Sequence, residues 1–93
     1  MGSLEIIVYS KPDCCLCEQV KAELKKLQRL YNFVWREINI LDDPSAFERF
    51  QDEIPVVLIN GRKAFKYHLD ERRFLRLLES AGRKRRTEAS PAT

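Results

Sequence analysis

The chain has 93 residues, of which 44% are hydrophobic and 33% are charged, so it has room for one small domain with a single core. No apolar run is long enough to span a membrane, and the first ten residues lack the basic start and long apolar stretch of a signal peptide. The net charge of +3 lies entirely in residues 83–93, because residues 1–82 carry 13 Lys and Arg against 13 Asp and Glu. This balance gives the folded part no charge bias toward nucleic acid.

The first part of the chain alternates strand and helix patterns. Residues 4–9 are a largely β-branched run that predicts a buried strand. A helix of about 17 residues follows and ends at Asn32, with an apolar stripe made of Val20, Leu24, Leu27 and Tyr31. Residues 33–40 then predict a second strand.

A short helix is predicted after the turn at residues 41–44. Asp43 can cap this helix, and Pro44 suits its first position. Phe47 and Phe50 are expected to form its apolar side.

The last part of the chain predicts a hairpin followed by a helix. Residues 54–59 form a third strand, and Asn60-Gly61 then indicates a tight turn into a fourth strand, because both turn positions need positive φ. The final helix begins at Asp70 and ends at Gly82. Its buried stripe is expected to comprise Phe74, Leu77, Leu78 and Ala81.

The resulting order, β-α-β-α-β-β-α, predicts an α/β fold. A strand–helix–strand unit implies a right-handed crossover and a parallel pair, and the hairpin adds an antiparallel edge. We therefore expect a four-stranded mixed sheet with helices on both faces, in a single domain at residues 1–82. Residues 83–93 lack apolar periodicity and are expected to form a basic, disordered tail, for which we favour a solvated segment over a nucleic-acid patch.

All three cysteines lie within KPDCCLCEQV, residues 11–20. If helical phase holds, Cys14 and Cys17 lie about 60° apart around the axis with Cα atoms roughly 5 Å apart, which a disulfide tolerates. Cys15 and Cys17 lie about 200° apart, and the adjacent Cys14 and Cys15 could join only in a strained ring. The spacing predicts a redox-active Cys14–Cys17 pair with Cys15 as a spacer.

The same helical phase separates the roles of the two paired cysteines. Cys17 lies three residues before Val20 and continues the buried stripe. Cys14 lies at the helix N-terminus, where unpaired N–H groups and the positive end of the helix favour a thiolate. We predict that Cys14 is the nucleophile and that Cys17 resolves the mixed disulfide. Lys11 would further favour the thiolate, whereas Asp13 would oppose it.

Two other interpretations of the cysteine cluster remain. The cysteines could be chance core residues, but a C-x-x-C at a strand-to-helix junction of a β-α-β unit argues against that. A structural zinc site needs about four ligands. Outside the cluster the chain offers only His68 and carboxylates, and there is no second C-x-x-C. We therefore expect no metal site.

The segments YSKPDCCLCE at residues 9–18 and IPVV at residues 54–57, together with the Asn60-Gly61 hairpin, resemble the glutaredoxin-like branch of the thioredoxin superfamily. The resemblance covers about residues 4–81 in order and spacing. It implies a thioredoxin fold, dithiol–disulfide exchange and a cis Ile54–Pro55 peptide beside Cys14. It also implies that the Ile54 backbone pairs with bound substrate. The predicted substrate-binding set is Lys11, Ile54 and Pro55.

Two departures from that family's pattern bear on glutathione and on Cys15. Typical glutaredoxins carry Gly-Gly before the last helix, followed closely by an acid, where glutathione is held. This chain has Lys66-Tyr67-His68-Leu69-Asp70 there, so glutathione can serve as a reductant but its usual binding motif is missing, and Asp70 is expected to cap the helix. Cys15 is interpreted as a spacer without a role, or else as a free thiol open to glutathionylation or oxidation.

These observations predict a small thiol–disulfide oxidoreductase that reduces protein or low-molecular-weight disulfides and contributes to cell redox homeostasis. Clustered cysteines in a chain without a signal peptide favour the cytoplasm. We expect a monomer with no bound cofactor, reduced by glutathione or a reductase donor, and without membrane or nucleic-acid partners. The alternative is a thioredoxin-fold binding module, either an iron–sulfur-bridging dimer or a non-catalytic protein adaptor.

Overall fold

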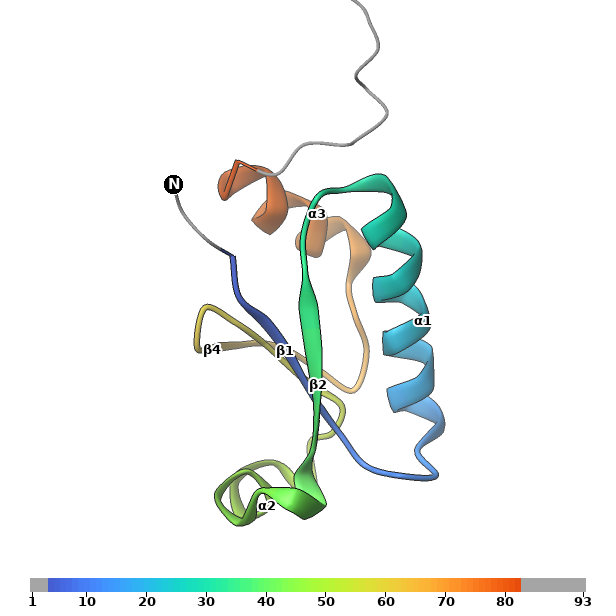
Figure 1. The fold of residues 1–93 in the computed structure, drawn as a ribbon, viewed down its shortest axis with the longest axis vertical. Helices are drawn as coiled ribbons and strands as arrows, with labels where there is room; N and C mark the ends of the chain where they lie inside the picture. Colours follow the sequence, from blue (N-terminus) through green and yellow to red (C-terminus); the bar gives the residue numbers. More distant parts are fainter. Residues whose placement is uncertain (1–3, 83–93) are drawn as a thin grey trace, which may run out of the picture.

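The structure, a computed structural model, describes residues 4–82. The predicted tail at residues 83–93 lies outside the described residues, so the expectation of disorder there stays a prediction. In chain order the elements are β1 (Ile6–Ser10), α1 (Cys15–Leu30), β2 (Trp35–Asn39), the 3-10 turn η1 (Ile40–Asp42), α2 (Pro44–Phe50), β3 (Val56–Ile59), β4 (Arg62–Lys66) and α3 (Glu71–Ser80) (Figure 1).

The four strands form one mixed sheet in the order β2-β1-β3-β4. β1 and β2 are parallel, as the α1 crossover requires, with Val8 opposite Glu37 in the register. β3 pairs antiparallel with both β1 and β4. The predicted four-stranded mixed sheet is therefore confirmed, and its two central strands are β1 and β3.

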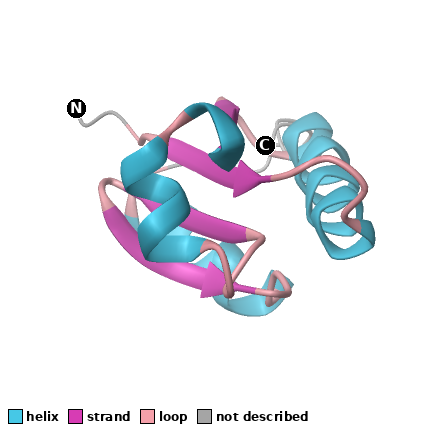
Figure 2. Ribbon diagram, turned by 90° about the horizontal axis from the view of Figure 1, so that it is seen from below, coloured by secondary structure: helices cyan, strands magenta, loops and turns pink. Residues whose placement is uncertain are grey.

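Side chains that alternate along the strands fill two apolar clusters, one on each face of the sheet, and Figure 2 shows helices flanking the strands. The larger cluster lies beneath α1 and α3, and its buried members are Leu4, Ile6, Val8, Val20, Leu24, Leu27, Phe33, Val57, Ile59, Phe65, Phe74 and Leu78. The smaller cluster lies beneath α2, and its buried members are Ile7, Cys17, Ile40, Ala46, Phe50, Ile54, Val56 and Leu58. Helices on both faces are thus confirmed.

The turn and cap residues behave as predicted. The Asp43 side chain accepts a hydrogen bond from the Ala46 N–H at the start of α2, and Pro44 is the first residue of that helix. Asn60 and Gly61 both have positive φ, 53° and 83°, which is the conformation a two-residue hairpin turn needs.

Two predicted apolar stripes are wrong in part. Phe47 is 37% exposed, whereas Ala46 and Phe50 are buried. Ala46 and Phe50 are four residues apart and lie one above the other on the helix, while Phe47 is rotated away from them. Ala81 is also exposed, because α3 ends at Ser80 and the buried stripe stops at Leu78.

Candidate functional site

Cys14 and Cys17 are joined in a disulfide at the N-terminus of α1, with their Cα atoms 5.2 Å apart. This pairing is the one predicted from helical phase. Cys17 is fully buried, Cys14 is half-buried, and Cys15 is an exposed free thiol. The predicted order of exposure within the pair is therefore confirmed, since Cys14 is more exposed than Cys17.

Cys14 is the N-cap residue of α1. It has extended backbone angles, and its Sγ accepts a hydrogen bond from the Cys17 N–H at 3.1 Å. Ser, Thr, Asp or Asn usually fill this position, so sulfur here takes the place of a capping oxygen. An N–H group directed at sulfur, at the positive end of a helix dipole, stabilises a thiolate once the disulfide is reduced.

The predicted cis peptide between Ile54 and Pro55 is present. Ile54 is buried in the smaller cluster, which also holds Cys17 and borders Cys14, and Pro55 is fully buried. The Pro55 carbonyl accepts a hydrogen bond from the Tyr67 N–H at 2.9 Å. The structure thus brings both cysteines together with the segment before β3.

The backbone polar groups of Ile54 are unpaired in the described part of the chain. Among residues 4–82, no group forms a hydrogen bond with its N–H or its carbonyl oxygen. Unpaired backbone groups at the start of a strand are suited to pair with an extended peptide. The N–H and carbonyl oxygen that the predicted substrate-binding role of Ile54 requires are therefore without a hydrogen-bond partner among residues 4–82.

Lys11 lies in the loop between β1 and α1 and is exposed. It makes no hydrogen bond or ion pair with any other residue that the structure describes. Its assignment to the substrate-binding set stays a prediction. Asp13, two residues later, has a positive φ of 60° in the turn that leads into the helix.

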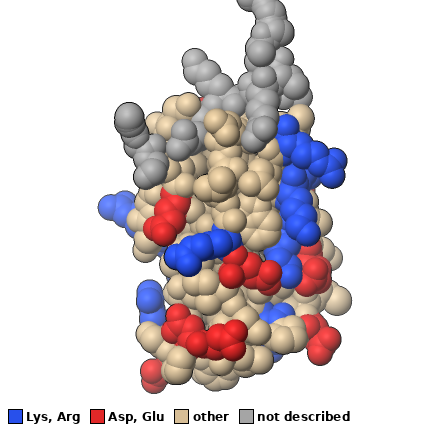
Figure 3. Space-filling view, viewed as in Figure 1, with Lys and Arg blue, Asp and Glu red and all other residues tan. Residues whose placement is uncertain are grey.

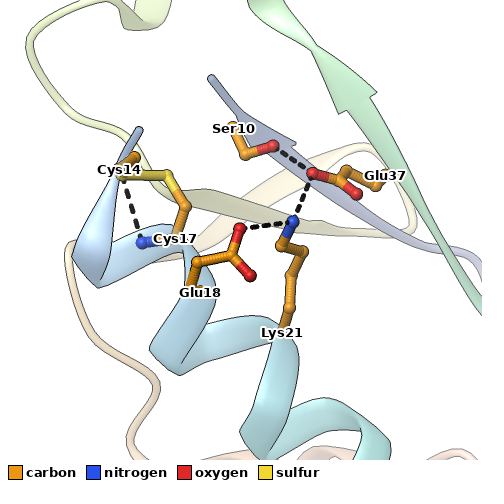
Figure 4. Close-up of a disulfide and its surroundings, with 6 residues drawn as sticks. All are labelled: Ser10, Cys14, Cys17, Glu18, Lys21 and Glu37. Atoms are coloured by element: carbon orange, nitrogen blue, oxygen red, sulfur yellow. Dashed lines mark hydrogen bonds and ion pairs between the residues drawn. A yellow bond between two sulfur atoms is a disulfide. The ribbon is translucent and has the colours of Figure 1, made fainter. Parts of the chain in front are cut away.

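A polar network beside the disulfide was missed by sequence reasoning (Figure 4). The buried Ser10 hydroxyl donates to Glu37 Oε2, and Lys21 Nζ lies 2.9 Å from the same oxygen. Lys21 Nζ also lies 2.9 Å from Glu18 Oε2. The network joins the end of β1, the first turns of α1 and the edge strand β2.

The hydrogen bonds in this network shift the titration of its charged groups. The Ser10 hydroxyl, and then Lys21, hold the pKa of Glu37 below its ordinary value of 4.5, although partial burial opposes that shift. The pKa of Lys21 is raised above 10.5, chiefly by hydrogen bonds to Glu18 and Glu37. Both groups are therefore charged at neutral pH. The sequence offered one signal for this network, the i,i+4 spacing of Lys21 from Cys17 on the predicted helix. The contact of Lys21 with Glu37 depends on how β1 pairs with β2, which local sequence does not give.

The segment before α3 differs from the Gly-Gly pattern of typical glutaredoxins. Tyr67 occupies a left-handed conformation with φ of 69°, which usually favours glycine. Its hydroxyl donates to the Asp52 carbonyl at 2.8 Å. Asp70 caps α3 by accepting from the Arg73 N–H, as predicted. The carboxylate thus already has a structural partner.

Residues 4–82 lack the side-chain cluster that a metal site needs. There, no three or more His, Cys, Asp or Glu side chains gather in a way that would hold a metal ion. Within the same residues, no helix has the length and apolar character needed to cross a membrane. The face seen in Figure 3 carries both basic and acidic side chains.

Comparison with known proteins identifies the family to which the chain belongs. No curated protein matches its sequence, but the glutaredoxin-like domain family (DUF836) matches residues 5–79. Protein Ne2328 from Nitrosomonas europaea is 25% identical with a TM-score of 0.73, covering 83% of this chain and 93% of that one. Thioredoxin-like protein BC3987, in a mutant form, is 28% identical with a TM-score of 0.57, covering 78% and 97%.

The likeness extends to thioredoxins themselves. Plasmodium falciparum thioredoxin superposes with a TM-score of 0.60 at 12% identity, covering 91% of this chain and 75% of that one. At that identity the match shows the fold alone, and it confirms the thioredoxin fold implied by the sequence resemblance. The family match spans most of the chain, including both paired cysteines and the segment around Pro55. The chain belongs to the glutaredoxin-like domain family (DUF836) of the thioredoxin superfamily.

Proposed function

We propose that this protein is a cytoplasmic thiol–disulfide oxidoreductase that reduces protein or low-molecular-weight disulfides through Cys14 and Cys17. One observation carries the proposal: Cys14, a half-buried residue, caps α1 through its sulfur, which accepts a hydrogen bond from the Cys17 N–H, while the Cys17 sulfur bonded to it is fully buried. A thiolate stabilised at a helix N-terminus is the attacking species in disulfide exchange.

The reaction takes two exchange steps. The Cys14 thiolate attacks one sulfur of the substrate disulfide, forms a mixed disulfide and releases the other substrate sulfur as a thiolate. Cys17 then loses its proton and attacks Cys14 Sγ, which forms the Cys14–Cys17 disulfide and releases the second substrate thiolate. Two electrons pass from the protein to the substrate. A dithiol or two glutathione molecules, or a thioredoxin-reductase-type donor, must return them.

The substrate-binding surface includes the segment that precedes β3. The unpaired Ile54 backbone would hydrogen-bond an extended stretch of substrate, with the buried Pro55 shaping the floor beside the sulfurs. The exposed Lys11 would contact acidic groups next to the substrate disulfide. A monomer suffices for this chemistry, because both cysteines come from one chain.

The test measures reduction of insulin or hydroxyethyl disulfide by the wild type, Cys14→Ser and the matched control Cys15→Ser. We expect Cys14→Ser to lose at least about 100-fold in rate, since it lacks the attacking thiolate. Cys15→Ser should retain wild-type activity. Full activity in Cys14→Ser would refute the assignment. Visible iron–sulfur absorbance in protein purified without oxygen would instead favour the cluster-bridged dimer.

The reductant is identified by the same assay. Glutathione with glutathione reductase, and thioredoxin reductase alone, are supplied as separate donors. Because glycines are missing between Lys66 and Asp70, we expect a weaker dependence on glutathione than a glutaredoxin with Gly-Gly shows. A saturable, high-affinity response to glutathione would contradict that expectation.

A further inference from the structure

Lys21 connects the helix that carries both cysteines to the edge strand of the sheet. It lies four residues after Cys17 in α1, so the two side chains project from the same side of the helix. The Lys21 side chain is only 18% exposed, and its ammonium lies between carboxylate oxygens of Glu18 and Glu37 at 2.9 Å each. The position of the Lys21 ammonium is therefore more restricted than in an ordinary exposed ion pair, because two carboxylates hold it and little of the side chain is exposed.

Ser10 brings a third element to the same point. It is the last residue of β1, four residues before Cys14, and it is 1% exposed. Its hydroxyl donates to Oε2 of Glu37, the same oxygen that Lys21 contacts. In Figure 4, dashed lines join Ser10 and the Lys21 ammonium to this carboxylate, and the disulfide lies to the left of this group at the start of the same helix. The strand before the cysteines and the helix after them therefore meet at one charged group.

The charges of this network matter because reduction of the disulfide creates charge. The oxidised pair is neutral, whereas a thiol of the reduced pair must lose its proton to become the attacking thiolate. A nearby cation favours that thiolate and a nearby anion disfavours it. Stabilising the reduced form makes a disulfide more oxidising. A charged Lys21 would therefore raise the reduction potential of the Cys14–Cys17 couple, and a charged Glu37 would lower it.

We propose that Lys21 and Glu37 are positioning residues that set the reduction potential of the Cys14–Cys17 couple, with Ser10 holding the Glu37 carboxylate in place. The proposal deepens the proposed function and rests on it for its biological meaning. In this arrangement Glu37 offsets the Lys21 charge and keeps the reduction potential of the Cys14–Cys17 couple low, so that the two thiols act as a reductant. Glu18 shares the lysine, and Lys25 adds a further cation toward Glu37.

The experiment measures the dithiol–disulfide equilibrium of Cys14 and Cys17 in glutathione redox buffers for Glu37→Gln, Lys21→Gln and the double variant. Glu37→Gln should shift the equilibrium toward the reduced form by up to about tenfold, which corresponds to about 30 mV. Lys21→Gln should shift it the opposite way by a similar factor. The double variant should lie between the single variants, near the wild type.

The opposite signs separate this role from a structural one. If the network only stabilised the fold, both single variants would lower the melting temperature and move the equilibrium in one direction or not at all. Lys21→Arg keeps the cation and should leave the equilibrium within about twofold of the wild type. A shift of about tenfold with Lys21→Arg would overturn the proposal, whether or not Lys21→Gln folds.

A matched control lies further along the same helix. Lys26 and Glu23 form an i,i+3 ion pair at 3.8 Å that does not include any member of the network. Glu23→Gln and Lys26→Gln should leave the equilibrium unchanged. The equilibrium is measurable without turnover. Wild-type values in the Glu37 and Lys21 variants would therefore refute this proposal alone, whereas an active Cys14→Ser would refute the proposed function.

Discussion

The two faces of the sheet differ in both size and chemistry. The larger cluster, beneath α1 and α3, consists entirely of apolar side chains without a nucleophile. The smaller cluster, beneath the seven-residue α2, contains Cys17 and borders Cys14. The paired sulfurs thus lie on the side covered by the short α2, while the other side holds the larger set of buried apolar residues.

This difference indicates a division between stability and reactivity. Stability scales with the apolar area that folding buries, so the larger cluster should dominate it. In disulfide exchange the Cys14 thiolate must approach a substrate sulfur in line with the substrate S–S bond. The site must therefore stay close to the surface. Changes in the larger cluster should therefore alter stability without altering the chemistry, and changes around the smaller cluster should alter the chemistry with a smaller loss of stability.

The largest expected effect is the loss of stability in Phe74→Ala. Phe74 is fully buried and packs edge-on against Phe33 and Phe65, with ring centroids 5.4 and 6.2 Å away. Removing a buried phenyl ring costs about 3–5 kcal/mol of unfolding free energy, which urea unfolding would measure. The reduction potential of the folded fraction should match the wild type. A potential that shifts together with stability would contradict the division between the two faces.

Cys17→Ala should show the converse behaviour. Its side chain is fully buried but small, so the reduced protein should lose only about 1–2 kcal/mol. Without the resolving thiol, the mixed disulfide between Cys14 and the substrate should accumulate, and mass spectrometry of the intact protein would detect it. Release of the second substrate thiol at the wild-type rate would show that Cys17 is not the resolving cysteine.

A smaller effect comes from the caps of the two helices on opposite faces. Asp43 caps α2 and Asp70 caps α3, each by accepting a backbone N–H. Either change to Ala should cost about 1 kcal/mol. Because α2 covers the smaller cluster, only Asp43→Ala should speed alkylation of the reduced Cys17 thiol. Equal acceleration by Asp70→Ala would mean that the sulfur is exposed by global rather than local opening.

Local sequence rules predicted much of the fold and the disulfide. The Asn60-Gly61 turn, the Asp43 cap and the Cys14–Cys17 pairing each depend on residues within four positions of one another, where backbone geometry is nearly fixed. The cis Ile54–Pro55 bond came from the family resemblance, since spacing alone does not distinguish cis from trans.

The rest depended on contacts between distant segments. The exposed side of a short helix such as α2 is set by what packs against it, which is why Phe47 was placed on the wrong side. Ser10 and Glu37 are separated by 27 positions and meet only through the register of β1 with β2. The role of Lys11 stays a prediction, because among residues 4–82 the structure gives it no hydrogen bond or ion pair.

The smallest expected effect is a pH dependence carried by Glu37. Its folded pKa is lowered, first by the Ser10 hydrogen bond and then by Lys21. The stabilisation it provides is therefore complete above its ordinary pKa of 4.5 and is lost as the pH falls through the lowered folded value. The difference in unfolding free energy between wild type and Glu37→Gln, measured in urea, should shrink from about pH 7 to about pH 3.

Glu48→Gln provides the control for this pH series, because Glu48 is exposed and forms no ion pair or hydrogen bond within the described part of the chain. Its difference from the wild type should stay flat over the same range. If the Glu37 difference is equally flat, the carboxylate is not held by Ser10 and Lys21 in solution. The contact between α1 and β2 would then be too weak to influence the sulfurs, and the side of the sheet covered by α2 would depend on packing alone.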